Sequence, residues 1–366
     1  MRFPRFPLTI SARAVFSSSI AVAAVGFAIA PLAGQTSAKP VAVKAVKAFA
    51  IPKTPWGDPD LRGVYTNNDE SGIPFERPAE FDGKRLEDVS DSELNELRQE
   101  RAEQAVERAP TLGGAPGVHN PVHWFENFNA QNSRAWLVTD PPDGHVPPLT
   151  PEGRQRAAAA ATRPQVYNTG SDSYEERGLY DRCITRGIPG SMMPAIYGNA
   201  YEIVQGPGYA AILYEMIHEA RVIPLDNRPH SKIRTLMGDA RGHFEGSTLV
   251  VETTNFDERS AYRGATSSMK LIERFTRTAP DVVEWTVTVD DPHTWTRPWT
   301  FAMNLAKKDD SQRPFEYACH EGNYGLRNIL SAARAEEREA AKSGRTIARP
   351  TAGGPAIDPS TPAEAR

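Results

Sequence analysis

Two segments carry the side chains best suited to proton transfer, and the first is residues 213–223. Along a strand, alternation would place Tyr214, Met216 and His218 on one face. If that face lines the inside of a barrel, His218 is a candidate general base in apolar surroundings. The alternative is a core histidine that hydrogen-bonds a backbone carbonyl.

The second segment, residues 319–324, places an imidazole, a carboxylate, an amide and a phenol around one glycine. In a functional interpretation His320 or Tyr324 donates or accepts the proton, and Glu321 sets the imidazole tautomer. In the alternative, the segment is the N-terminal region of a helix with local hydrogen bonds. The sequence leaves both interpretations open.

The two cysteines, Cys183 and Cys319, predict a single disulfide if the protein works in an oxidising compartment. Two buried free thiols are the alternative. A bridge would bring Arg186 close to the His320 loop, where a guanidinium could hold a carboxylate or a developing oxyanion. A surface salt bridge is the other role open to Arg186.

A further charged group, Asp239, Arg241 and His243, falls on one side of an extended segment. Alternation along a strand brings such side chains together. We expect structural ion pairing there rather than chemistry.

A metal site is not predicted, and no cofactor is implied. His119 and His123 have helical i,i+4 spacing, but Pro121 between them disfavours a helix. The chain lacks a G-x-S-x-G elbow, a P-loop and a dinucleotide fingerprint. The chain therefore lacks the residues that define an α/β serine hydrolase, a P-loop NTPase and a Rossmann enzyme.

The elements that must position these side chains are short strands. Turn signals at residues 206–208, 245–247 and 279–281 separate alternating runs, with Val283, Trp285, Val287 and Val289 on one face of the clearest one. The absence of a helical period favours a nearly closed sheet. We predict a mainly β fold: an antiparallel barrel-like core, lipocalin-like in shape, with peripheral helices and long wrapping loops. The expected strands are 201–205, 209–223, 249–254, 270–276, 282–289, 299–305 and 315–319.

Three helices flank this core in the prediction. A capping box at residues 90–93 opens a charged helix to about 108, Thr150 caps a second through 157–161, and a third covers 327–342. The expected organisation is a signal peptide (1–38), a lead with wrapping loops and two surface helices (39–165), the barrel-like core (166–332), and a helical end with a disordered tail (333–366).

The first residues have the layout of a secretory signal. Arg2, Arg5 and Arg13 precede an apolar run at 14–33 without any acidic residue. Cleavage near 33–38 would leave the protein free in the periplasm or secreted, with no membrane contact. An uncleaved anchor is the alternative, because the run is long for a signal core.

Composition limits the partners. The chain has 366 residues, 39% of them hydrophobic and 24% charged, which is typical of a globular protein. Without the three N-terminal arginines, 39 basic residues face 46 acidic ones, a formal charge of about −7. A nucleic-acid partner is disfavoured because binding to phosphates requires a basic surplus or stripe. The oligomeric state is not specified by the sequence.

Several motifs give the chain a resemblance to a broad group of exported bacterial proteins of uncharacterised function. They are TPWGDPDL at 54–61, GSMMP at 190–194, HEARVI at 218–223, DNRPH at 226–230, WT at 299–300 and HEGNY at 320–324. The resemblance spans roughly residues 54–332. It implies export and a β core and transfers no activity or catalytic residue.

These observations lead to three hypotheses. The first is an exported, cofactor-independent lyase, hydratase or isomerase that acts on a small hydrophobic or aromatic molecule through His218, His320, Tyr324 and Arg186. The second is a non-catalytic periplasmic carrier of such a ligand. The third is a structural or interaction protein of the cell envelope. The expected substrate-binding residues are Tyr201, Tyr214, Met216 and Glu321.

Overall fold

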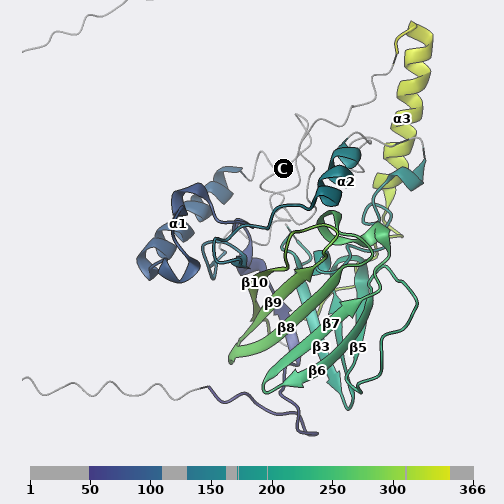
Figure 1. The fold of residues 1–366 in the computed structure, drawn as a ribbon. Coiled ribbons are helices and arrows are strands. Elements are labelled where there is room, and N and C mark those ends of the chain that lie inside the picture. The colour runs from purple at the N-terminus through teal and green to yellow at the C-terminus, as the bar shows by residue number, and fades with distance from the viewer. Residues whose placement is uncertain are drawn as a thin grey trace, which may run out of the picture. The chain divides into compact units, whose positions relative to one another are not determined.

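The computed structural model describes residues 49–108, 130–161, 171, 173–195, 197–309 and 311–346. In these ranges the protein is mainly β, as predicted: one antiparallel sheet of ten strands forms a nearly closed barrel, accompanied by three α-helices (Figure 1). The predicted signal segment, His119, His123 and most of the predicted tail lie outside the described residues.

The sheet is built from two meanders joined by one N-terminal strand. The order is β5-β4-β3-β1-β10-β9-β8-β7-β6, and β2 also pairs with β10. Strand β1 connects the meanders because it pairs with β3 on one side and β10 on the other. The strands are β1 (Gly63–Thr66), β2 (Val138–Asp140), β3 (Ala200–Gly206), β4 (Tyr209–Tyr214), β5 (Glu219–Pro224), β6 (Asp239–Glu245), β7 (Thr248–Thr254), β8 (Lys270–Ala279), β9 (Val282–Asp290) and β10 (Trp299–Lys307).

The barrel closes where its two end strands, β5 and β6, approach each other. A Cβ atom on Gly242 of β6 would lie 2.7 Å from Ile223 Cγ2 on β5 and 2.7 Å from Leu225 Cδ2. A side chain at this position would force the Ile223 and Leu225 side chains to move, so glycine allows the two edges to approach closely.

The inside of the barrel is occupied by large side chains. On β9, Val283, Trp285, Val287 and Val289 have no exposed surface, which confirms the face predicted from alternation. Trp285 meets Phe301 of β10 edge to face, with 5.7 Å between ring centroids. Interior residues of neighbouring strands belong to the same buried cluster, as expected of a small barrel.

The three helices confirm the sequence prediction within a few residues. They are α1 (Asp91–Arg108), α2 (Pro151–Ala161) and α3 (Tyr324–Ser343). The capping box is present, because Glu93 N donates to Ser90 Oγ at 3.3 Å and Ser90 N donates to Glu93 Oε2 at 3.0 Å. Within the described residues no helix combines the length and the apolar character needed to cross a bilayer.

Three predicted boundaries differ from the structure. Strands β1 and β2 complete the sheet although they fall in the 39–165 region that was predicted to wrap around it. Residues 315–319 form a loop instead of a strand. The run 209–223 is a hairpin of β4 and β5 instead of one strand.

Candidate functional site

The β4–β5 hairpin places His218 outside the barrel. The chain turns at residues 215–218, where Ile217 and His218 both have positive φ angles of 66° and 57°. His218 is exposed, and Val222 is 63% exposed. The prediction that His218 faces the lumen is wrong because a turn, which interrupts the alternation, lies inside the segment that was interpreted as one strand.

The segment 319–324 is the N-terminal region of α3, which was the alternative interpretation. Asn323 caps the helix by accepting a hydrogen bond from Leu326 N at 3.1 Å. His320 and Glu321 are exposed, and Tyr324 is 67% exposed. His218 and His320 therefore do not face one enclosed cavity, and the predicted pair of lumenal bases is not formed.

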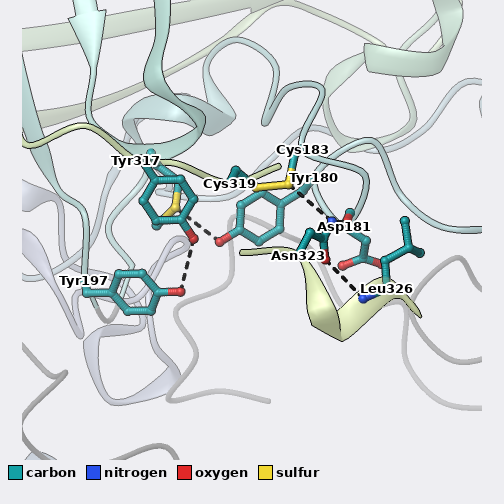
Figure 2. Close-up of a disulfide and its surroundings, with 9 residues drawn as sticks. Tyr180, Asp181, Cys183, Tyr197, Tyr317, Cys319, Asn323 and Leu326 are labelled. Atoms are coloured by element: carbon teal, nitrogen blue, oxygen red, sulfur yellow. Dashed lines mark hydrogen bonds between the residues drawn. A yellow bond between two sulfur atoms is a disulfide. The ribbon is translucent and has the colours of Figure 1, made fainter. Parts of the chain in front are cut away.

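The predicted disulfide is confirmed. Cys183 and Cys319 are bonded, with 5.7 Å between their Cα atoms and 136 residues between them in the sequence. Asn323 reinforces the junction, since its Nδ2 donates to Asp181 O at 2.9 Å and to Cys183 Sγ at 3.3 Å (Figure 2). The bond and the amide together fix the start of α3 against the loop around residue 181.

A cleft of about 400 Å³ lies beside this disulfide. Its walls come from the loop at 180–183, the loop at 316–319 and the first two turns of α3. They combine phenol rings, aliphatic side chains, both cysteines and two glycines. The lining residues are Tyr180, Asp181, Cys183, Glu316, Tyr317, Ala318, Cys319, Gly322, Asn323, Gly325, Leu326 and Ile329.

Two tyrosines of the cleft extend into a small aromatic cluster. The hydroxyl oxygens of Tyr317 and Tyr197 are 3.3 Å apart, and their rings stack with centroids 6.4 Å apart. Tyr180 donates its hydroxyl to Met216 Sδ at 3.3 Å. Figure 2 shows the Tyr180, Tyr197 and Tyr317 rings grouped beside the disulfide. The cluster connects the cleft wall to the β4–β5 turn.

The phenols of this cleft are held in their neutral form. Burial raises the pKa of Tyr317, and the neighbouring hydroxyls of Tyr180 and Tyr197 raise it further. Burial also raises the pKa of Tyr180, against the opposing effect of the Arg186 guanidinium, whose carbon lies 5.6 Å from the ring centroid. Both groups therefore remain hydrogen-bond donors at neutral pH and are poorly suited to act as bases.

Ionisable side chains in the cleft are acidic or already paired. Asp181 Oδ2 lies 3.0 Å from Arg177 Nη2, so its charge is compensated. Glu316 is exposed at the rim. The lining contains no histidine, lysine or arginine among the described residues. Arg186 stacks on Tyr180 from outside the lining.

The other predicted binding residues belong to the core. Tyr201 donates its hydroxyl to Asn67 Oδ1 at 3.2 Å, and its ring lies 6.1 Å from that of Tyr214. Both rings are buried, as is Met216, which reaches the cleft only through its contact with Tyr180. The structure thus places Met216 and Arg186 in contact with Tyr180 of the cleft, outside the lining itself, and leaves Tyr201 and Tyr214 inside the barrel.

A buried ion pair crosses the barrel and was missed by the sequence analysis. Arg221 of β5 donates through Nη1 and Nη2 to the two carboxylate oxygens of Glu273 on β8, with 3.0 Å for the Nη2 bond. Trp285 Nε1 donates to Glu273 Oε1 at 3.2 Å. Both ionic side chains are almost completely buried. Alternation along β5 places Arg221 on the same face as the buried Ile223, and this spacing is the signal in the sequence.

The predicted ion pairing around Asp239 is confirmed and is more extensive than expected. Arg241 Nη1 lies 2.6 Å from Asp239 Oδ1, and His243 contacts Glu245 instead. The ring nitrogens of His230 lie 3.1 Å from Asp239 Oδ2 and 3.2 Å from Glu252 Oε1. This network lies where β6 and β7 pair, and none of its residues lines the cleft.

Comparisons with known proteins do not assign the chain to a family. No family model matches it, and no curated protein matches it. Among solved structures, the chain is similar to a secretory abundant heat soluble protein from Ramazzottius varieornatus, with 14% identity over 30% of this chain and 74% of that one. The TM-score of 0.22 is too low for this likeness to carry any argument about fold or function.

Proposed function

We propose that the protein is an exported, non-catalytic binding protein for a small organic molecule, and that the ligand occupies the cleft beside the disulfide. The observation that carries the proposal is the cleft itself: about 400 Å³, with two phenol rings on one side and Leu326 and Ile329 of α3 on another. This volume lies within the range of about 300–1,000 Å³ that is common for small-molecule sites.

The walls favour a ligand with a flat or branched apolar body and a hydrogen-bonding group. Aromatic and aliphatic side chains supply most of the contact area of such sites, and a few polar groups fix the orientation. In this cleft, the neutral phenols of Tyr180 and Tyr317 supply polar oxygen atoms, with the Tyr180 hydroxyl donating to Met216 Sδ and the Tyr317 hydroxyl in contact with that of Tyr197. The Asn323 amide is engaged in the cap and the loop contacts. A hydrophobic or aromatic compound fits these properties.

Binding is favoured over acid–base catalysis by the chemistry of the lining. A general base must lie within hydrogen-bond reach of the reacting proton, with a pKa near the working pH. His218 and His320 are exposed and do not line the cleft, and burial moves the pKa of Tyr180 and Tyr317 away from neutrality.

Export is part of the same proposal. The disulfide is stable in an oxidising compartment and would be kept reduced in most cytosols. The N-terminal layout of basic residues followed by an apolar run supports the same location. We therefore place the binding protein in the periplasm or outside the cell.

A cleft-filling variant tests the proposal. Gly325 lies in the lining and in the first turn of α3, and a Cβ there would have its nearest contact at 3.8 Å, to Asn323 Oδ1. Gly325→Leu should thus fill the cleft without a clash and without weakening the helix, because leucine is a better helix former than glycine. The probe is N-phenyl-1-naphthylamine, a neutral aromatic amine that fluoresces in apolar surroundings.

We expect the disulfide-bonded protein to bind this probe and Gly325→Leu to weaken binding at least about tenfold, a loss of about 1.4 kcal/mol. The matched control is Ala332→Leu, which adds similar bulk at an exposed position on α3 outside the lining. Equal affinity of Gly325→Leu and the unmodified protein, or no binding by the unmodified protein, would contradict the proposal.

A further inference from the structure

We infer that the Cys183–Cys319 disulfide couples ligand affinity in the cleft to the redox state of the protein, so that reduction releases the ligand and a bound ligand protects the disulfide. The inference rests on the proposed function, because it concerns the regulation of that same site.

The disulfide is part of the cleft. Both cysteines belong to the cleft lining, and their bond joins the two chain segments, 180–183 and 316–319, that contribute to its walls. A ligand in the cleft therefore lies against the disulfide and limits the approach of a reductant. Cys183 is 5% exposed, whereas Cys319 is half-buried, so Cys319 is the more accessible residue of the pair.

The α3 wall of the cleft depends on the disulfide. Within the described chain, the contacts that join 311–346 to the rest include two hydrogen bonds from Asn323, the Tyr317–Tyr197 hydroxyl contact and an ion pair at 3.6 Å between the exposed Arg313 and the half-buried Glu202. One Asn323 bond is made to the Cys183 sulfur itself. Reduction removes the covalent tie and disturbs the amide that positions the start of α3.

The backbone at Cys183 has a φ of 57°. This left-handed conformation is unfavourable for a residue with a Cβ atom, and such residues persist only where surrounding structure holds them. The disulfide and the Asn323 contact hold Cys183 in place, together with a backbone hydrogen bond from Cys183 N to Tyr180 O at 2.9 Å. Once the bond opens, the loop can relax and the cleft wall moves.

The chemistry requires a dithiol reductant. One thiolate of the dithiol attacks Cys319 Sγ and displaces the Cys183 thiolate, which takes up a proton, and a mixed disulfide forms. The second thiol of the reductant then attacks the reductant sulfur that is bonded to Cys319 Sγ, and Cys319 is released as a thiol. Two electrons and two protons pass to the protein, and the reductant leaves as its cyclic disulfide.

Thermodynamic linkage makes the coupling reciprocal. If reduction weakens ligand binding by some factor, a saturating ligand must shift the disulfide equilibrium towards the oxidised protein by the same factor. The two effects can be measured independently with the probe N-phenyl-1-naphthylamine and with dithiothreitol as the dithiol.

The first measurement compares probe affinity of the oxidised protein, the protein reduced by dithiothreitol, and the Cys183→Ser/Cys319→Ser variant. We expect the dissociation constant to rise at least about tenfold in both forms that lack the bond. The second follows the reduction rate of the oxidised, folded protein with increasing probe; we expect the rate to fall as the cleft fills. This second measurement remains informative even if the reduced protein unfolds.

The outcomes separate the two proposals. In one outcome, the oxidised protein binds the probe and Gly325→Leu blocks binding, but the affinity does not depend on the redox state and the reduction rate does not depend on the probe. The coupling is then wrong and the proposed function stands. If Gly325→Leu leaves binding unchanged, the cleft is not the site and both proposals fail. The Gly325→Leu variant also serves as a control for the reduction experiment. In this variant the probe should no longer slow reduction of the disulfide, which excludes the possibility that the probe acts directly on dithiothreitol.

Discussion

The barrel interior and the disulfide cleft deal with polar groups in opposite ways. Inside the barrel, Arg221 and Glu273 neutralise each other, and Trp285 donates to the same carboxylate, so these polar groups serve the protein's own structure. In the cleft, the phenols of Tyr180 and Tyr317 border open volume. The sheet therefore forms a closely packed body, and the loops around residues 180–183 and 316–319 form the cleft to which we assign binding in our proposal.

The largest effect should come from breaking the interior ion pair. Glu273→Leu leaves the Arg221 charge buried without a partner, and we expect a loss of about 3–5 kcal/mol in the free energy of unfolding, measured with urea. Arg221→Met/Glu273→Leu, which removes both charges, should restore most of this loss. If the single and double variants are equally unstable, the pair does not behave as a buried charge pair.

Removal of the disulfide should have a smaller effect on stability and a larger one on the cleft. For Cys183→Ser/Cys319→Ser we expect a loss of about 2–4 kcal/mol, because the unfolded chain gains the entropy of an open loop. The β signal in far-UV circular dichroism at 25 °C should persist, since the strands do not include the cysteines. Loss of that signal would show that the barrel itself depends on the bond.

The pH dependence of probe binding separates a binding cleft from a catalytic one. Since burial raises the pKa of both Tyr180 and Tyr317, neither phenol should ionise between pH 6 and 9. We expect the affinity for the neutral probe to be constant over this range in fluorescence titrations. A transition within it would indicate a group in the cleft that titrates near neutrality, which favours the acid–base hypothesis.

The smallest expected effect concerns a turn at the end of β9. Burial alone would raise the pKa of Asp291, but hydrogen bonds from Thr266 N, Thr294 Oγ1 and His293 N hold it below its usual value. The folded state therefore binds the Asp291 proton less tightly than the unfolded state does. The resulting stability is present above the unfolded pKa of about 3.9 and is lost as the pH falls through the lower folded value.

Asp291→Asn should accordingly cost about 1 kcal/mol at pH 7 and progressively less as the pH falls below 4. Thermal unfolding of both proteins at several pH values measures this difference. A difference that grows on acidification would mean that the carboxylate is destabilising in the fold. Thr248→Val, which replaces a strand hydroxyl that does not ionise, is a control whose effect should not change with pH.

Much of the barrel could be predicted because each clear strand has an alternating pattern and a turn with glycine or proline at its end. Strand β9 and its buried face follow directly from the spacing of Val283, Trp285 and Val287. The β4–β5 turn could not be predicted in this way. It lacks glycine and proline, and Ile217 adopts a positive φ that sequence rules do not anticipate for a β-branched residue.

The candidate site was predicted only in part. The disulfide follows from two cysteines and an oxidising compartment, and it correctly identifies the two chain segments that meet. The tyrosine cluster could not be inferred, because Tyr180, Tyr197 and Tyr317 come from separate loops without a shared pattern. The histidines attracted attention because of their chemistry, yet position in the fold decides whether an imidazole can act, and both lie on the surface.

The most direct test of the central claim is an amide ¹⁵N NMR titration of the oxidised protein with N-phenyl-1-naphthylamine. We expect the largest shifts at residues 180–183 and 316–329, and little change at interior residues such as Trp285 and Tyr214. Shifts centred on the interior faces of the strands, with the cleft residues unaffected, would contradict the account and place the ligand inside the barrel.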